Sequence, residues 1–147
     1  MNREKFIIKA CKDLDLDVER YEDRDVWVAT LNDDLSLVID CEAERQIQVY
    51  CALKPFDGDS NIKSIFLFMS IYNQSAEYHH MEYDAKYNSC RVSGYVIHGD
   101  ARDSISVTMM KNMLVRCINN AVDISEHIYK VAKGMCNPLL AIDQMKA

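Results

Sequence analysis

The sequence is short of glycine and proline, with only four glycines and two prolines among 147 residues. It contains no G-x-G-x-x-G, no P-loop and no G-x-S-x-G motif, and so few glycines leave little material for a loop that cradles phosphate. C-x-x-C and H-x-x-x-H spacings are also missing, and the adjacent His79 and His80 would point to opposite faces of a strand. We therefore expect no cofactor, no metal ion and no hydrolytic centre.

Long apolar runs and positive charge are scarce as well. The most apolar window, Ile62–Tyr72, is far too short to cross a bilayer. The chain carries 17 Lys and Arg against 23 Asp and Glu, which gives a net charge of −6 and disfavours both nucleic acid and anionic membrane surfaces. No secretion signal follows Met1. We expect a cytoplasmic protein with no nucleic-acid or membrane partner.

Six cysteines are present, and their spacing favours free thiols. The chain is long enough to bury a core without covalent cross-links, and several cysteines occupy apolar positions of strands or helices, where a thiol packs as a small hydrophobe. None precedes a helix with glycine beside it, the setting that favours a reactive thiolate. A thiol-dependent enzyme nevertheless stays open as an alternative, because a cysteine and its histidine can meet in space without being close in sequence.

Acidic charge is concentrated in one part of the chain. Twelve of the 23 Asp and Glu residues lie between Asp13 and Glu44. This segment is either a solvated face that favours solubility or a patch that steers a basic segment of a partner.

The periodicity of apolar residues predicts one α+β domain over residues 1–147. The expected elements are a helix over 2–14, strands at 26–31, 35–40 and 47–53, a helix from a cap at Ser60 or Asn61 to Asn73, a hairpin of 77–83 and 89–98, a helix over 103–133 and a last helix from Pro138. A break at Gly99-Asp100 separates the hairpin from the long helix. The order α-β-β-β-α-β-β-α-α implies a mostly antiparallel sheet of about five strands, backed by helices.

The longest predicted helix carries a regular apolar seam. Its residues follow alternating spacings of three and four: Val107, Met110, Leu114, Cys117, Ala121, Ile124, Ile128 and Val131. Gly134 is the residue expected just after the helix, and Asn137-Pro138 is typical of a cap and first residue of the next one. The seam should pack on the sheet or on the preceding helix.

The helix over 62–72 is apolar on more than one side. One stripe is expected to face the sheet, namely Ile62, Ile65, Phe66, Met69 and Tyr72. Leu67, Phe68 and Ile71 form a second patch, which needs either another chain or the long third helix lying across it. We predict a homodimer that uses this patch, and we include Tyr50 and Trp27 in the same candidate dimer or partner surface.

The sequence from Ile47 to Met145 resembles the YbjN family of sensory-transduction regulators. The resemblance rests on the segments IQVYCALKPF (47–56), FMSIYN (68–73), MEYDAKYNSCRVSGYV (81–96), MKNML (110–114) and AKGMCNPLLAID (132–143). It implies the fold of the class I type III secretion chaperones, which are small, acidic, dimeric proteins that bind extended segments of effectors. The chain departs from those chaperones in its long third helix and its Asn-Pro-capped fourth. The resemblance carries no catalytic or ligand residues.

The sequence therefore favours a non-enzymatic protein-binding module, a chaperone-like adaptor or regulator that binds a segment of another protein. A dedicated type III secretion chaperone is the alternative within binding proteins. A thiol-dependent enzyme is the alternative from another class.

Overall fold

The computed structural model describes residues 3–43, 46–76, 79–98 and 106–146. Its elements are α1 (Arg3–Asp13), β1 (Glu19–Arg20), β2 (Val26–Thr30), β3 (Leu35–Asp40), β4 (Gln46–Leu53), α2 (Ile62–Ser75), β5 (His80–Asp84), β6 (Ser89–His98), α3 (Val107–Ala132) and α4 (Pro138–Lys146). The six strands form one antiparallel sheet in the order β1-β2-β3-β4-β6-β5. The predicted α+β class and element order are confirmed, and the two-residue β1 is added to the five predicted strands.

The helix ends follow the chemistry of the residues that cap them. The side chain of Asn61 accepts a hydrogen bond from the backbone N–H of Ser64 and begins α2, which decides between the two predicted caps. Gly134, with φ of +74°, ends α3 in the left-handed conformation that glycine adopts without steric cost. Asn137 accepts from the N–H of Leu139 and starts α4 at Pro138, as predicted. The predicted positions 77–78, 99–100 and 103–105 lie outside the described residues.

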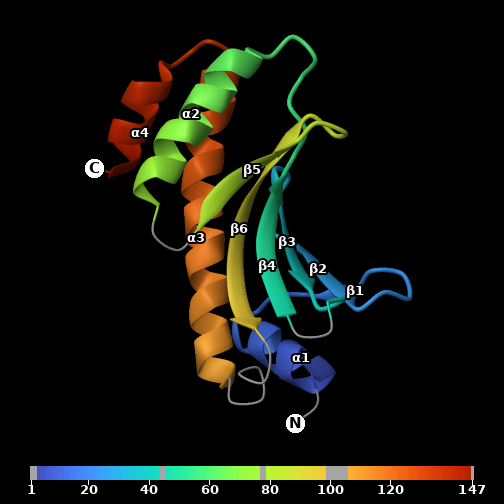
Figure 1. Cartoon of the computed structure of the whole chain (residues 1–147). Coiled ribbons are helices and arrows are strands. Elements are labelled where there is room, and N and C mark those ends of the chain that lie inside the picture. The colour runs from blue at the N-terminus through green and yellow to red at the C-terminus, as the bar shows by residue number, and fades with distance from the viewer. Residues whose placement is uncertain (1–2, 44–45, 77–78, 99–105, 147) are drawn as a thin grey trace.

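The sheet is covered by helices on one face (Figure 1). Helix α3 crosses β3, β4 and β6, and α1 packs against α3 at the lower end of the view. Along β4 the side chains alternate: Ile47, Val49, Cys51 and Leu53 are buried on the face that α3 covers, and Gln48, Tyr50 and Ala52 lie on the other. No helix within the described ranges covers that second face, which we call the open face.

Helices α2 and α4 form a further layer outside α3. They lie side by side and both contact α3, and α2 also runs beside the edge strand β5. The side chain of Asn73 pairs with the backbone of Met81 on β5, accepting from its N–H (2.7 Å) and donating to its carbonyl (3.0 Å). This contact occupies backbone groups on an edge that another strand could otherwise join. None of the helices described is long and apolar enough to cross a membrane.

The packing of α2 overturns part of the sequence prediction. Phe68, assigned to an outer patch, is fully buried, because α2 packs on α3 and turns Ile65, Phe68 and Met69 inward. Phe66, assigned to the sheet-facing stripe, is instead nearly half exposed and meets Tyr83 of β5 edge to face, with ring centroids 5.0 Å apart. The third helix lying across α2, one of the two explanations left open above, is what the structure shows for Phe68.

Candidate functional site

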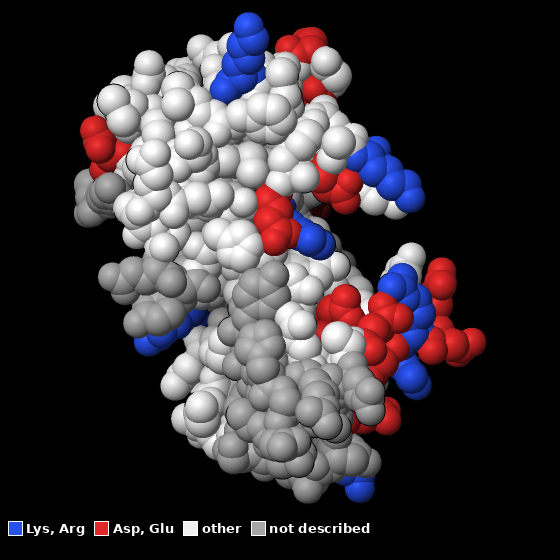
Figure 2. Space-filling view, viewed as in Figure 1, with Lys and Arg blue, Asp and Glu red and all other residues white. Residues whose placement is uncertain are grey.

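Large apolar side chains remain exposed on the outer layer of helices. We define the outer helical surface as the exposed residues of α2, α4 and the turn before α4: Ile62, Phe66, Leu67, Met135, Leu139 and Leu140. Their exposed fractions run from 36% for Ile62 to 72% for Met135. In Figure 2 the part of the molecule over α2 and α4 is mainly uncharged, whereas charged side chains gather on the opposite side, beside the sheet. This side of the molecule therefore combines few charged side chains with six exposed large apolar ones.

The local sequence explains why these residues face outward. Helix α4 begins at Pro138, and its periodicity turns Ala141 and Ile142 toward α2 and α3. Leu139 and Leu140 then fall on the remaining side of the helix and are more than half exposed. Exposed apolar clusters on a domain of this size are typical of protein-interaction surfaces.

The residues predicted for a dimer or partner surface do not all lie together. Leu67 belongs to the outer helical surface and is 52% exposed, and Ile71 on the same helix is half-buried. Trp27 is almost fully buried on the helix-covered face, because it pairs across β2 and β3 with Ile39, so its assignment to a surface is wrong, as is that of Phe68. The dimer itself stays a prediction.

Tyr50 lies apart from these residues, on the open face. The guanidinium of Arg91 lies over its ring, 5.0 Å from the centroid, and also pairs with the carboxylate of Glu82. Glu82 meets the Nε2 of His80 at 2.8 Å as well. Burial raises the pKa of Tyr50. The side chains on this part of the open face therefore hold one another in place.

A thiol pair lies inside the core, between the sheet and α3. The Sγ atoms of Cys51 on β4 and Cys117 on α3 are 3.8 Å apart, and both side chains are buried. The Sγ of Cys117 is also 3.7 Å from the carbonyl oxygen of Val92 on β6. The contact with the thiol of Cys51 lowers the pKa of Cys117 despite burial, and the same contact raises the pKa of Cys51.

His79 completes this group, which we call the dithiol cluster. Its imidazole acts with Cys51 to lower the pKa of Cys117. Its Nδ1 lies 3.1 Å from the amide nitrogen of Asn120, one helical turn beyond Cys117 on α3. A Cβ on Gly94 would stand 2.8 Å from the His79 ring, so only glycine in β6 lets the imidazole lie this close to the sheet.

The sequence reasoning missed the dithiol cluster. It treated Cys117 as one residue of an apolar seam and His79 as an ordinary strand residue. The one signal available was that Cys117 and Asn120, three residues apart, share a face of the long helix. Cys51 and His79 could join them only once the strand order placed β4 and β6 under the middle of α3.

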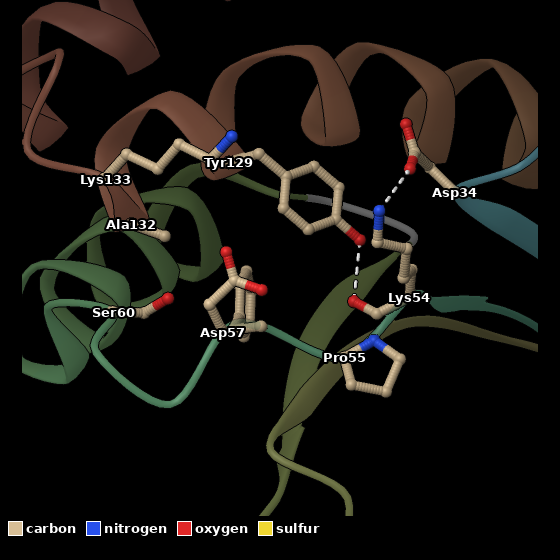
Figure 3. Close-up of a pocket in the computed structure, with 9 residues that line it drawn as sticks. Asp34, Lys54, Pro55, Asp57, Ser60, Tyr129, Ala132 and Lys133 are labelled. Atoms are coloured by element: carbon tan, nitrogen blue, oxygen red, sulfur yellow. Dashed lines mark hydrogen bonds and ion pairs between the residues drawn. The ribbon is translucent and has the colours of Figure 1, made fainter.

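A polar groove follows the loop between β4 and α2 where it crosses the end of α3 (Figure 3). It has a volume of about 270 Å³ and is lined by Asp34, Lys54, Pro55, Phe56, Asp57, Ser60, Tyr129, Ala132 and Lys133. The hydroxyl of Tyr129 donates to the carbonyl of Lys54 at 2.7 Å, and its ring packs on Phe56 with centroids 5.4 Å apart. Lysines and carboxylates alternate around the groove, so it favours no single charge of ligand. Its contacts fasten the loop to α3.

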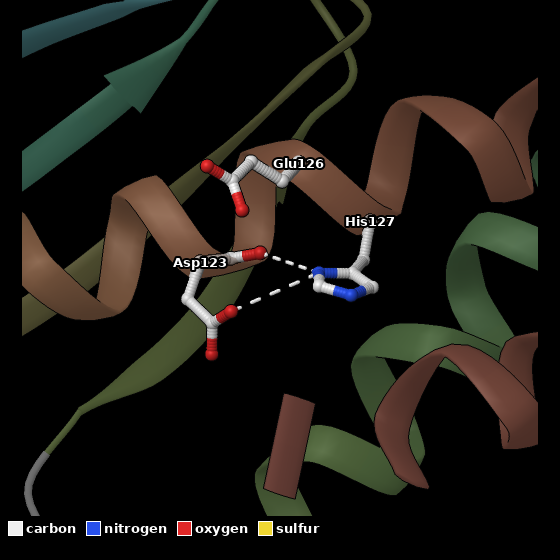
Figure 4. Close-up of side chains that lie close together, drawn as sticks. All are labelled: Asp123, Glu126 and His127. Atoms are coloured by element: carbon white, nitrogen blue, oxygen red, sulfur yellow. Dashed lines mark hydrogen bonds and ion pairs between the residues drawn. The ribbon is translucent and has the colours of Figure 1, made fainter. Parts of the chain in front are cut away.

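Three ligand-type side chains share one side of α3 (Figure 4). Among the described residues, Asp123, Glu126 and His127 alone bring three His, Cys, Asp or Glu ligand atoms within 4.8 Å of one another. The Nδ1 of His127 lies 2.8 Å from the backbone oxygen of Asp123 and 3.8 Å from its carboxylate. This nitrogen is therefore engaged by the helix itself. The spacing i, i+3, i+4 accounts for the group as neighbours on a helix surface.

Comparison with known proteins supports the fold. No family model matches the chain, and no curated protein matches it in sequence, so the YbjN resemblance stays a hypothesis. A chain of the HopA1–SchA chaperone–effector complex is similar in structure, with a TM-score of 0.55 over 79% of this chain and 87% of that one. The two sequences are 13% identical over the match, a level at which the likeness concerns the fold. The chain thus has the predicted α+β, chaperone-like fold.

Proposed function

We propose that this chain is a non-enzymatic protein-binding module, a chaperone-like adaptor or regulator that binds a segment of a partner protein. The observation that carries the proposal is the outer helical surface, where six large apolar side chains remain exposed outside a complete core. The fold shared with a chain of a chaperone–effector complex supports it. A dedicated secretion chaperone is the narrower form of the same function.

The energetics favour an apolar occupant for this surface. Burying a large apolar side chain contributes roughly 2 kcal/mol, at about 25 cal/mol per Å². Several such residues in one surface can therefore offset the cost of ordering a bound segment, as the central anchors of known interfaces do. A partner segment with leucine- or phenylalanine-type anchors fits the uncharged surface over α2 and α4 better than a charged one (Figure 2).

The same surface can join two copies of this chain. An isologous contact repeats each side chain on both subunits, so Leu67 would enter the interface twice. The proposed homodimer therefore uses the outer face of α2, with Leu67 in place of the buried Phe68.

The test compares the wild-type chain with two charged variants. The double variant Leu67→Glu and Leu139→Glu puts two carboxylates on the outer helical surface. Val115→Glu puts one carboxylate at an exposed position of α3, 39% accessible, outside that surface. We expect light scattering to show a dimer for the wild type and Val115→Glu, and a folded monomer for the double variant. A partner recovered by affinity purification from native cells should be lost in the double variant alone. The same mass and partner for all three proteins would overturn the proposal.

A thiol-dependent enzyme is not the function we propose. Cys117, His79 and Asn120 do bring together a thiol, an imidazole and an amide. Cys117 is only 1% exposed, however, and a nucleophile that acts on a substrate must reach it.

A further inference from the structure

We propose that Cys51 and Cys117 form an oxidisable dithiol, which a hydroperoxide converts into a disulfide that links β4 to α3, with His79 as a positioning residue. This inference is independent of the proposed protein-binding function. It rests on the contact of the two sulfurs and on the groups around them.

The two thiols are already neighbours. Their Sγ atoms are 3.8 Å apart, whereas a disulfide bond measures about 2.05 Å, so the sulfurs must approach by less than ~2 Å. They come from rigid elements, a central strand and the middle of the long helix, and both lie in the core. The pair is 66 residues apart in sequence, so a bond would close a long loop of chain.

The surroundings favour a thiolate on Cys117 over one on Cys51. The titratable groups that act on Cys117 are Cys51 from β4 and His79, the residue before β5. The charge of Cys117 in turn adds to burial in raising the pKa of Tyr72 on α2. The thiol of Cys51 and the imidazole of His79 both stabilise the thiolate, which lowers the pKa of Cys117. Asn120 and the absence of a side chain at Gly94 hold the imidazole in this position.

Two other buried cysteines serve as internal controls. Burial raises the pKa of Cys11 to about 11 and that of Cys90 to about 12. The Sγ of Cys90 lies 3.5 Å from the thioether sulfur of Met69, which cannot form a disulfide. Cys11 and Cys90 share the burial of the dithiol cluster, but burial raises the pKa of each of these two thiols.

The reaction balances with one equivalent of hydroperoxide. The Cys117 thiolate attacks the peroxide, an S–O bond forms as the O–O bond breaks, and protonation of the leaving oxygen gives water and a sulfenic acid. The Cys51 sulfur then attacks the sulfenic sulfur, the S–S bond forms, and the hydroxyl leaves with the thiol proton as a second water. Two thiols are oxidised by two electrons in total, and the peroxide is reduced by two.

The burial of both sulfurs selects the oxidant. Hydrogen peroxide is close to water in size, so a small, transient opening of the core is enough for it to reach the sulfurs. Glutathione disulfide must bring one of its own sulfurs into line with the attacking thiolate. Because Cys117 is only 1% exposed, this larger molecule cannot reach it in that way.

The test treats the fully reduced wild-type chain with hydrogen peroxide or with glutathione disulfide at neutral pH. After acid quenching, unfolding and alkylation, we expect peroxide to leave four alkylatable thiols in place of six, with one cross-linked peptide pair that contains Cys51 and Cys117. Glutathione disulfide should leave six over the same time. Six thiols after peroxide, or a cross-link between other cysteines, would overturn the proposal, and cross-linking by glutathione disulfide at the rate of peroxide would overturn the choice of oxidant.

Variants separate the roles of the residues. Cys90→Ala should cross-link at the wild-type rate, whereas Cys51→Ala should stop at a sulfenic acid on Cys117 that dimedone traps. His79→Gln should shift the midpoint of the pH–rate profile for cross-linking to higher pH, because the thiolate loses one stabilising partner. An unchanged pH profile in His79→Gln overturns the positioning role. A cross-link between Cys117 and another cysteine, formed at the wild-type rate in a folded Cys51→Ala protein, overturns the pairing.

Discussion

Helices α2 and α3 both carry apolar residues around much of their circumference, but they bury them to different extents. Helix α3 lies between the sheet and the layer of α2 and α4, and α1 covers part of it, so nine of its residues are buried. Helix α2 has α3, α4 and β5 as neighbours and nothing outside it within the described chain, so only Ile65, Phe68 and Met69 are buried. The difference lies in the number of layers around each helix.

The two helices therefore differ in whether their apolar residues stabilise the fold or remain available for binding. The apolar seam of α3 packs against the same chain, so it contributes to the core. On the outer side of α2, Leu67 stays 52% exposed, and burying it further requires another molecule. Substitutions in the buried seam of α3 should therefore change the free energy of unfolding, whereas substitutions on the outside of α2 should change association.

The largest effect is expected at Leu114, a fully buried residue of the α3 seam. Leu114→Asp removes its packing, worth about 2–5 kcal/mol, and places a carboxylate without a partner in the core, which adds to the loss. We expect no cooperative thermal transition by circular dichroism. The neighbouring Val115 is 39% exposed, so Val115→Asp should melt close to the wild-type temperature. Equal melting of both variants would mean that the seam does not face the core.

The seam of α3 shows what the sequence can predict. Seven of its eight residues are buried and Val107 is half-buried, because a helix enclosed by one chain imposes its 3.6-residue period on every apolar position. The caps at Asn61 and Asn137 and the glycine at 134 were predictable for a similar reason, since they depend only on local backbone geometry.

Helix α2 shows where such reasoning stops. Its sequence is apolar on two sides, and nothing within the helix states which side meets a neighbour. The predictions for Phe66 and Phe68 were therefore both wrong. Phe66 was expected against the sheet and is nearly half exposed, and Phe68 was expected on the outside and is buried. The dithiol cluster could not be predicted from the sequence for a related reason. Its members come from β4, α3 and the residue before β5, and only the strand order brings them together.

An intermediate effect is expected from a matched pair on α2. Phe68→Ala removes a fully buried aromatic ring and should lower the free energy of unfolding by about 3–5 kcal/mol, measured by urea denaturation. Leu67→Ala changes the adjacent residue, 52% exposed, and should stay within about 0.5 kcal/mol in the monomer. Dimer formation would add to the measured free energy of unfolding. Both measurements should therefore be made at a protein concentration where light scattering shows the monomer. A larger loss for Leu67→Ala than for Phe68→Ala would reverse the assignment of the two faces.

The smallest effect concerns the polar attachment of α2 to the sheet. Asn73→Ala removes two hydrogen bonds and leaves the N–H and C=O of Met81, a buried residue of β5, without their side-chain partner, at a cost of about 1–3 kcal/mol. Gln74 is exposed on the same turn of α2, and Gln74→Ala should be neutral within about 0.5 kcal/mol. Asn73→Ala should also speed hydrogen exchange at the Met81 amide, whereas amides in the middle of α3 exchange as in the wild type. Unchanged exchange at Met81 would mean that α2 is held to β5 by apolar contacts alone.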